Sequence, residues 1–68
     1  MRFTIETEQE DDGRWLAEVM EIPGVVQYGH NRDAAIGHAR ELALRVLADR
    51  TERGETPSEP VKILTAAA

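Results

Sequence analysis

The first part of the chain alternates between hydrophobic and polar positions. Over residues 2–8, Phe3 and Ile5 fall on one face of an extended segment, and charged or hydroxyl side chains fall on the other. A period of two predicts a half-buried β-strand. Residues 14–19 repeat the pattern, and the Asp12-Gly13 dipeptide before them suits the tight turn of a hairpin. We therefore expect these two segments to pair.

Two further short segments have the composition of strands. Residues 25–29 follow the Pro23-Gly24 turn, and the connection is too short for a crossover, so we expect a third, antiparallel strand. Residues 61–65 follow a polar, proline-containing connection. They predict a last strand with a backbone edge that is open to another chain.

Between the third and last strands the hydrophobic period changes from 2 to 3.6, which predicts a helix of about six turns. Asn31 is a suitable N-cap, and Gly54 is placed to end the helix. Leu44 lies opposite the apolar arc, on the face where solvent is expected. The arc itself consists of Ile36, Ala39, Leu42, Ala43, Val46 and Leu47.

These elements predict an α+β fold of order βββαβ, a two-layer single domain over residues 1–68 in which the amphipathic helix covers one sheet face. A chain of about 60 residues buries only about 60% of its unfolded surface, so its core is small. We therefore expect a homodimer or a higher oligomer. The candidate contact residues are Leu44 on the helix and Val61 and Ile63 on the last strand, and the pattern does not choose between these two surfaces.

Charge narrows the class of partner. The chain has 13 acidic residues against 8 Lys or Arg, a formal net charge of −5. That balance disfavours nucleic-acid binding, which requires clustered cations, and favours a basic protein. The candidate partner-binding residues are the carboxylates of the expected hairpin, Glu8, Glu10, Asp11 and Asp12. A solvated turn explains the same residues equally well.

No residue pattern indicates catalysis, a metal or a cofactor. Cysteine is absent, and His30 and His38 are not at a spacing typical of metal ligands. The many carboxylates are typical of an acidic surface, whereas acid–base catalysis needs a pair held in a pocket. We therefore expect a protein that is not an enzyme and holds no cofactor. No apolar stretch approaches the ~20 residues of a membrane span, and no signal-peptide core follows Met1, so a cytoplasmic location is expected.

Three motifs, in order, resemble the HicB antitoxin family. The first is the run from Asp11-Asp12-Gly13 to Pro23-Gly24-Val25. The second is the helix start from Gly29 to Ala35, in which His30 and Ala34 replace the usual acidic residues. The third is the connection over residues 54–60. Together they extend over nearly the whole chain.

The resemblance implies a partially degraded ribonuclease H-like fold whose last strand is parallel to the first. It also implies a role, because HicB proteins neutralise HicA, a small basic toxin that cleaves messenger RNA. A ribonuclease H needs several carboxylates on two metal ions, one of them near the end of its fourth strand. Residues 61–65 contain no carboxylate, so we expect no nuclease activity even if Glu6 occupies the first position.

HicB antitoxins commonly carry a C-terminal operator-binding segment, and this chain stops at Ala68. Operator binding is therefore not among the expectations, and the resemblance is to the N-terminal domain alone. The leading hypothesis is an antitoxin-like protein that masks a HicA-type toxin. The alternative is an oligomeric HicB-like domain that binds another protein or ligand and has no toxin partner.

Overall fold

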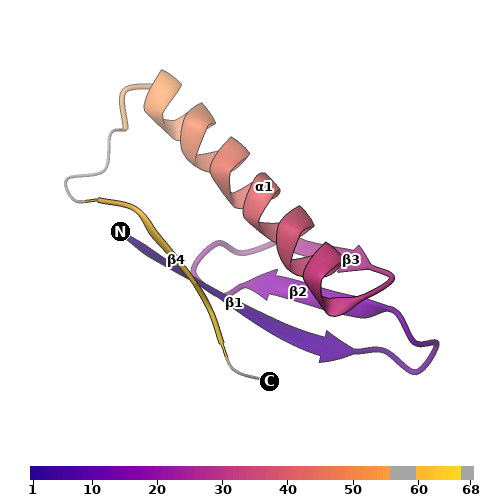
Figure 1. Ribbon diagram of the computed structural model, residues 1–68. Coiled ribbons are helices and arrows are strands. Elements are labelled where there is room, and N and C mark those ends of the chain that lie inside the picture. Colours follow the sequence, from indigo (N-terminus) through magenta and orange to yellow (C-terminus); the bar gives the residue numbers. More distant parts are fainter. Residues whose placement is uncertain (56–59, 67–68) are drawn as a thin grey trace.

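The computed structural model describes residues 1–55 and 60–66. It contains four strands and one helix, in the predicted order (Figure 1). Each predicted segment is confirmed to within a residue or two at its ends. The elements are β1 (Arg2–Gln9), β2 (Trp15–Val19), β3 (Val26–Gly29), α1 (Arg32–Glu52) and β4 (Lys62–Thr65).

The strands form one mixed sheet in the order β3-β2-β1-β4. β1 pairs antiparallel with β2, and β2 pairs antiparallel with β3, as short connections require. The long connection through α1 returns the chain to the other side of β1, where β4 runs parallel to it. The expected α+β fold is therefore confirmed, including the parallel last strand.

The helix begins and ends where the sequence predicts. The side chain of Asn31 accepts a hydrogen bond from the backbone N–H of Ala34 at 2.7 Å, which caps the first turn. At the other end, Gly54 has a φ of 87° and the N–H of Glu55 donates to the carbonyl of Arg50 at 2.8 Å. Only glycine adopts this left-handed conformation without strain, so Gly54 terminates the helix.

The core lies between α1 and one face of the sheet. Its strand side is formed by Phe3, Ile5, Ala17 and Val19, all nearly inaccessible to solvent. The predicted apolar arc of the helix is fully buried only in its first half, because Leu42, Val46 and Leu47 are only partly covered. A helix of 21 residues is about 31 Å long, whereas the 5 residues of β2 span about 17 Å. The second half of α1 therefore extends past β2 and β3 (Figure 1).

The overhanging helix makes the molecule longer than a compact domain. The radius of gyration is 12.5 Å, compared with about 11 Å expected for a chain of this length. α1 packs most extensively on β3 and β2, less on β1, and makes little contact with β4. Along its described length α1 is too polar to cross a membrane.

The helix approaches the sheet closely because the residues between them are small. Ala35, Ala39 and Ala43 follow one another at four-residue intervals on the buried face of α1, and none is exposed. Gly29, at the end of β3, lies directly under the first turn. A Cβ atom on Gly29 would overlap the backbone nitrogen of Ala35 and lie 2.9 Å from the Cβ of Ala34.

We predict that Gly29→Ala destabilises the fold by about 2 kcal/mol, because the added methyl group must displace helix backbone rather than a flexible side chain. Gly37→Ala is the matched control. A Cβ on Gly37 has no neighbour within 4 Å, and alanine in a helix interior is favoured over glycine by about 0.5–1 kcal/mol. Urea unfolding of both variants measures the difference, and a Gly29→Ala variant as stable as wild type would contradict the tight contact.

Candidate functional site

The acidic hairpin projects from the end of the sheet that lies away from the C-terminus of α1 (Figure 1). Gly13 has a φ of 90°, and its N–H donates to the carbonyl of Glu10, as the turn predicted at Asp12-Gly13 requires. The side chains of Glu8, Asp11 and Asp12 are exposed, and that of Glu10 is half-buried. The four predicted carboxylates are therefore brought together on one solvent-facing tip.

One of the four charges is already compensated. Oδ1 of Asp12 accepts the backbone N–H of Arg14 at 3.0 Å, and Oδ2 forms an ion pair with the Arg14 side chain at 2.8 Å. The backbone hydrogen bond, followed by the side chain of Arg14, lowers the pKa of Asp12. The guanidinium of Arg14 also lies 5.0 Å from the centre of the Tyr28 ring. Asp12 therefore holds the turn, and the carboxylates left to attract a partner are Glu8, Glu10 and Asp11.

A second carboxylate with a lowered pKa also supports the backbone. Oε1 of Glu21 accepts the N–H of Thr4 at 2.6 Å, beyond the last residue of β2. That hydrogen bond is the main cause of the lowered pKa of Glu21. The carboxylate thus continues the β1–β2 ladder after the chain has turned away. A general acid or base needs a pKa near the working pH, so Asp12 and Glu21 are both shifted in the wrong direction for that task.

The sheet face opposite α1 is covered by no described element. Three of the four large hydrophobic side chains with nearly half their surface exposed lie on it, Met20 at 47%, Tyr28 at 44% and Leu64 at 44%. Sequence reasoning did not select these residues. Alternation places them opposite the core residues, but only the register shows that β1, β2, β3 and β4 expose this face together.

The register also brings two carboxylates into direct opposition. Glu6 of β1 pairs with Glu18 of β2 on the uncovered face, and Glu8, next along that face of β1, pairs with Leu16. Like charges directly opposite one another destabilise a sheet. Neither Glu6 nor Glu18 has a compensating ion pair within residues 1–55 and 60–66. The carboxylates therefore run from the hairpin tip to Glu6 and Glu18 on the uncovered face, whereas the cations Arg2 and Lys62 lie at the other end of that face. We call the area from the tip to Glu6 and Glu18, with the apolar side chains beside it, the acidic face.

The three predicted oligomer residues lie in two different settings. Leu44 is 47% exposed on the side of α1 that faces away from the sheet. Val61 and Ile63 are half-buried because their side chains already pack against the core. β4 itself is an edge strand, as expected. Leu44 lies on α1, and α1 makes little contact with β4, so the two candidate contacts lie on different elements.

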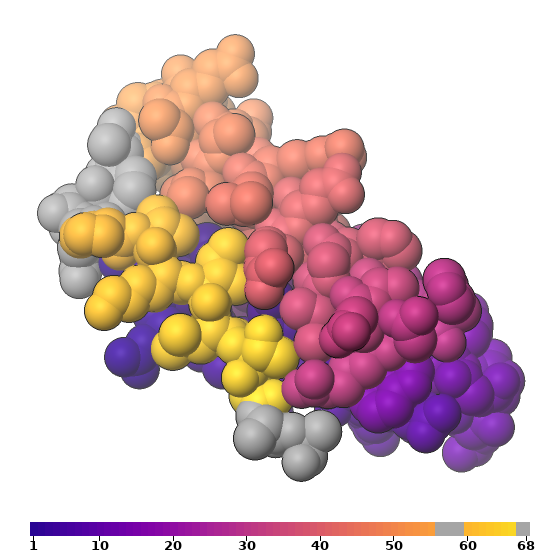
Figure 2. Space-filling view, viewed as in Figure 1, coloured from indigo at the N-terminus to yellow at the C-terminus, as the bar shows by residue number. Residues whose placement is uncertain are grey.

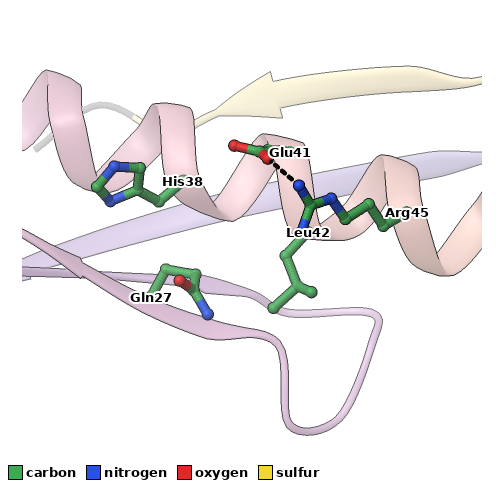
Figure 3. Close-up of a pocket in the computed structure, with 5 residues that line it drawn as sticks. All are labelled: Gln27, His38, Glu41, Leu42 and Arg45. Atoms are coloured by element: carbon green, nitrogen blue, oxygen red, sulfur yellow. Dashed lines mark hydrogen bonds and ion pairs between the residues drawn. The ribbon is translucent and has the colours of Figure 1, made fainter.

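A shallow groove of about 250 Å³ lies between β3 and α1, lined by Gln27, His38, Glu41, Leu42 and Arg45 (Figure 3). Nδ1 of His38 lies 2.8 Å from the backbone carbonyl oxygen of Tyr28 and donates to it. Glu41 and Arg45 form an ion pair across one helical turn. Three of the four polar side chains of the groove thus bond to one another or to the edge of β3, an arrangement that supports the fold. Within the described residues no cluster of histidine and carboxylate side chains has the geometry to hold a metal ion.

The comparisons with known proteins add no relative. No family model, no curated protein and no solved structure matches the chain.

We predict that the Glu21 hydrogen bond contributes to stability only while Glu21 is ionised. Its pKa is lowered in the folded state, so the contribution is present above the unfolded value and is lost as the pH falls through the folded value. Glu21→Gln imitates the protonated side chain. It should lower the free energy of unfolding by about 0.5 kcal/mol near neutral pH, since the bond is exposed, and by almost nothing at an acid pH below the folded pKa of Glu21.

Glu8→Gln is the matched control, because it removes one carboxylate from β1 without removing a hydrogen bond seen in the described residues. Chemical unfolding at both pH values measures the two differences. An equal effect of Glu21→Gln at neutral and acid pH would show that the charge of Glu21 does not support the ladder.

Proposed function

We propose that the chain is a non-catalytic, HicB-like antitoxin that binds and neutralises a small, basic, HicA-type RNA-cleaving toxin. The three sequence motifs support the family, and the parallel β4 beside β1 is the arrangement that the resemblance implies. A cytoplasmic location follows from the proposal, because the toxin acts on messenger RNA.

The observation that carries the proposal is the acidic face. Its apolar side chains supply surface that gains free energy on burial, since about 25 cal/mol is gained for each Å² removed from water. Its carboxylates, above all the opposed pair Glu6 and Glu18, favour a partner that brings positive charge. A basic protein docked there would relieve the repulsion that the free chain carries.

The same residues argue against an enzyme. Glu6 and Glu18 are adjacent, but β4 (Lys62–Thr65) offers no third carboxylate beside them. We predict that the purified chain does not cleave RNA or an RNA–DNA hybrid in magnesium or manganese. Cleavage that disappears in Glu6→Gln would overturn this part of the proposal.

The direct test is inhibition of a toxin. The product of a neighbouring gene, if it encodes a short basic protein, is purified and its cleavage of messenger RNA is measured with increasing amounts of the chain. We expect cleavage to stop near a fixed stoichiometric ratio. If cleavage continues in excess chain, the alternative of an oligomeric HicB-like domain without a toxin partner replaces the proposal.

The hairpin should steer the encounter. We predict that neutralising Glu8, Glu10 and Asp11 together, by replacement with the corresponding amides, lowers the association rate with the toxin about tenfold at low salt. The salt dependence of the rate should become shallower. Asp12 is kept, because its carboxylate holds the turn. Stopped-flow or surface-binding kinetics measure the rate.

A matched control carries the same change of charge at the far end of the molecule. It neutralises three exposed carboxylates at and after the C-terminus of α1, namely Asp49, Glu52 and Glu55. If both triple variants lower the association rate equally, overall charge and not the hairpin attracts the toxin.

A further inference from the structure

The two edges of the sheet differ in how their outward backbone groups are used. On β3, the pairing with β2 turns the backbone groups of Val26 and Tyr28 outward. The N–H of Val26 donates to the carbonyl of Gly24 at 3.1 Å, and the carbonyl of Tyr28 accepts from His38 at 2.8 Å. The edge of β3 is therefore partly closed to a further strand.

The edge of β4 has no such protection. The N–H of Lys62 donates to Met1, and that of Ala66 donates to Ile5, so alternation turns the backbone groups of Ile63 and Thr65 away from β1. No hydrogen bond within the described residues uses those outward groups. α1 makes little contact with β4, and Figure 2 shows the side chains of β4, in yellow, uncovered at the surface.

We propose that β4 pairs with β4 of a second copy of this chain, antiparallel and centred on Ile63, to form one continuous sheet. The proposal goes beyond toxin binding and does not depend on it. An antiparallel pair of identical strands is related by a two-fold axis, and such closed pairing is the commonest form of self-association. Ile63 then exchanges two hydrogen bonds with Ile63 of the partner subunit, and Thr65 does so with Val61 of the partner subunit.

The charge on β4 disfavours one neighbouring register, and the register centred on Ile63 pairs all three outward-facing residues of 61–65 with one another. When the two-fold axis is perpendicular to the sheet, opposed residues of the two strands lie on the same face. The axis therefore passes between the two copies of one residue, which oppose each other. Centred on Ile63, the pairing sets Lys62 opposite Leu64 of the partner subunit, and the lysine stem can lie along the leucine. Centred on Lys62, it would set Lys62 opposite Lys62 of the partner subunit, and that like-charge contact is unfavourable. Lysine on an edge strand ordinarily discourages pairing; in this strand it disfavours the register centred on Lys62 and is compatible with the one centred on Ile63.

Leu44 belongs to a different surface. It is exposed on α1, an element that takes no part in a β4 pair and makes little contact with β4, so we expect a β4 pair to leave it exposed. Substitutions at Leu44 and on β4 can therefore distinguish the two candidate dimer contacts, the helix face and the strand edge.

The test is sedimentation of the isolated chain over a range of concentrations. We expect a reversible dimer. Leu64→Lys sets lysine opposite lysine on both sides of the axis and should raise the dimer dissociation constant about tenfold. Adding Lys62→Glu to Leu64→Lys restores an opposite-charge pair in the Ile63-centred register only, and should recover wild-type affinity. Leu44→Glu should leave the dimer unchanged.

A backbone variant tests the hydrogen bonds separately. Thr65 is exposed and its N–H points outward, so Thr65→Pro removes a donor from the dimer and none from the β1–β4 ladder. Thr65→Val retains the donor and is the control, and circular dichroism shows that each variant is folded. A wild type that is monomeric at hundreds of micromolar overturns the proposal. The proposal is also wrong if Leu44→Glu dissociates the dimer and Leu64→Lys does not. It is equally wrong if Leu64→Lys weakens the dimer and the addition of Lys62→Glu does not restore it.

Discussion

The close contact between the first half of α1 and the end of β3 determines which strands the helix covers and which remain exposed to solvent. Gly29 leaves no room for a side chain beneath Ala34 and Ala35, and Ala39 keeps the helix near the sheet for a further turn. A helix is a stiff rod, so fixing its first turns fixes its direction. It then lies over β3 and β2, and it leaves β4 almost untouched. The small residues thus allow α1 to pack closely on β3 and β2, and the resulting direction of the helix leaves the edge of β4 uncovered.

A single helix can cover only one face of a sheet, and a chain of 68 residues has no second helix in its described part to cover the other. The uncovered face therefore needs polar or charged side chains of its own to remain in contact with water. Here it carries Glu6 and Glu18 opposite each other, a pairing that costs stability and that serine or threonine would avoid. Such a cost is retained more readily where a bound partner relieves it, which is why we propose a basic protein as the partner of the acidic face.

Local patterns in the sequence were sufficient for the elements, because strands, caps and turns depend on neighbouring residues. Asn31 and Gly54 both have the predicted capping roles, and the Asp12-Gly13 turn forms as expected. The remaining features depend on contacts between distant segments. Neither the Glu6–Glu18 pair nor the Glu21–Thr4 hydrogen bond could be found without the register of β1 on β2. The half-burial of Val46 and Leu47 likewise follows from the direction in which the helix crosses the sheet. Hydrophobic periodicity does not predict that direction.

The acidic face and the edge of β4 use different parts of the same sheet. A partner on the acidic face contacts side chains that project perpendicular to the strands, whereas a second copy at β4 binds backbone groups that lie in the plane of the sheet. The two contacts are therefore geometrically compatible, and a dimer formed through β4 would present two acidic faces on the same side of one longer sheet. Lys62 and Leu64 lie where these two contacts meet. Their substitution therefore tests the dimer most directly in the isolated chain, where no other bound partner contacts these two side chains.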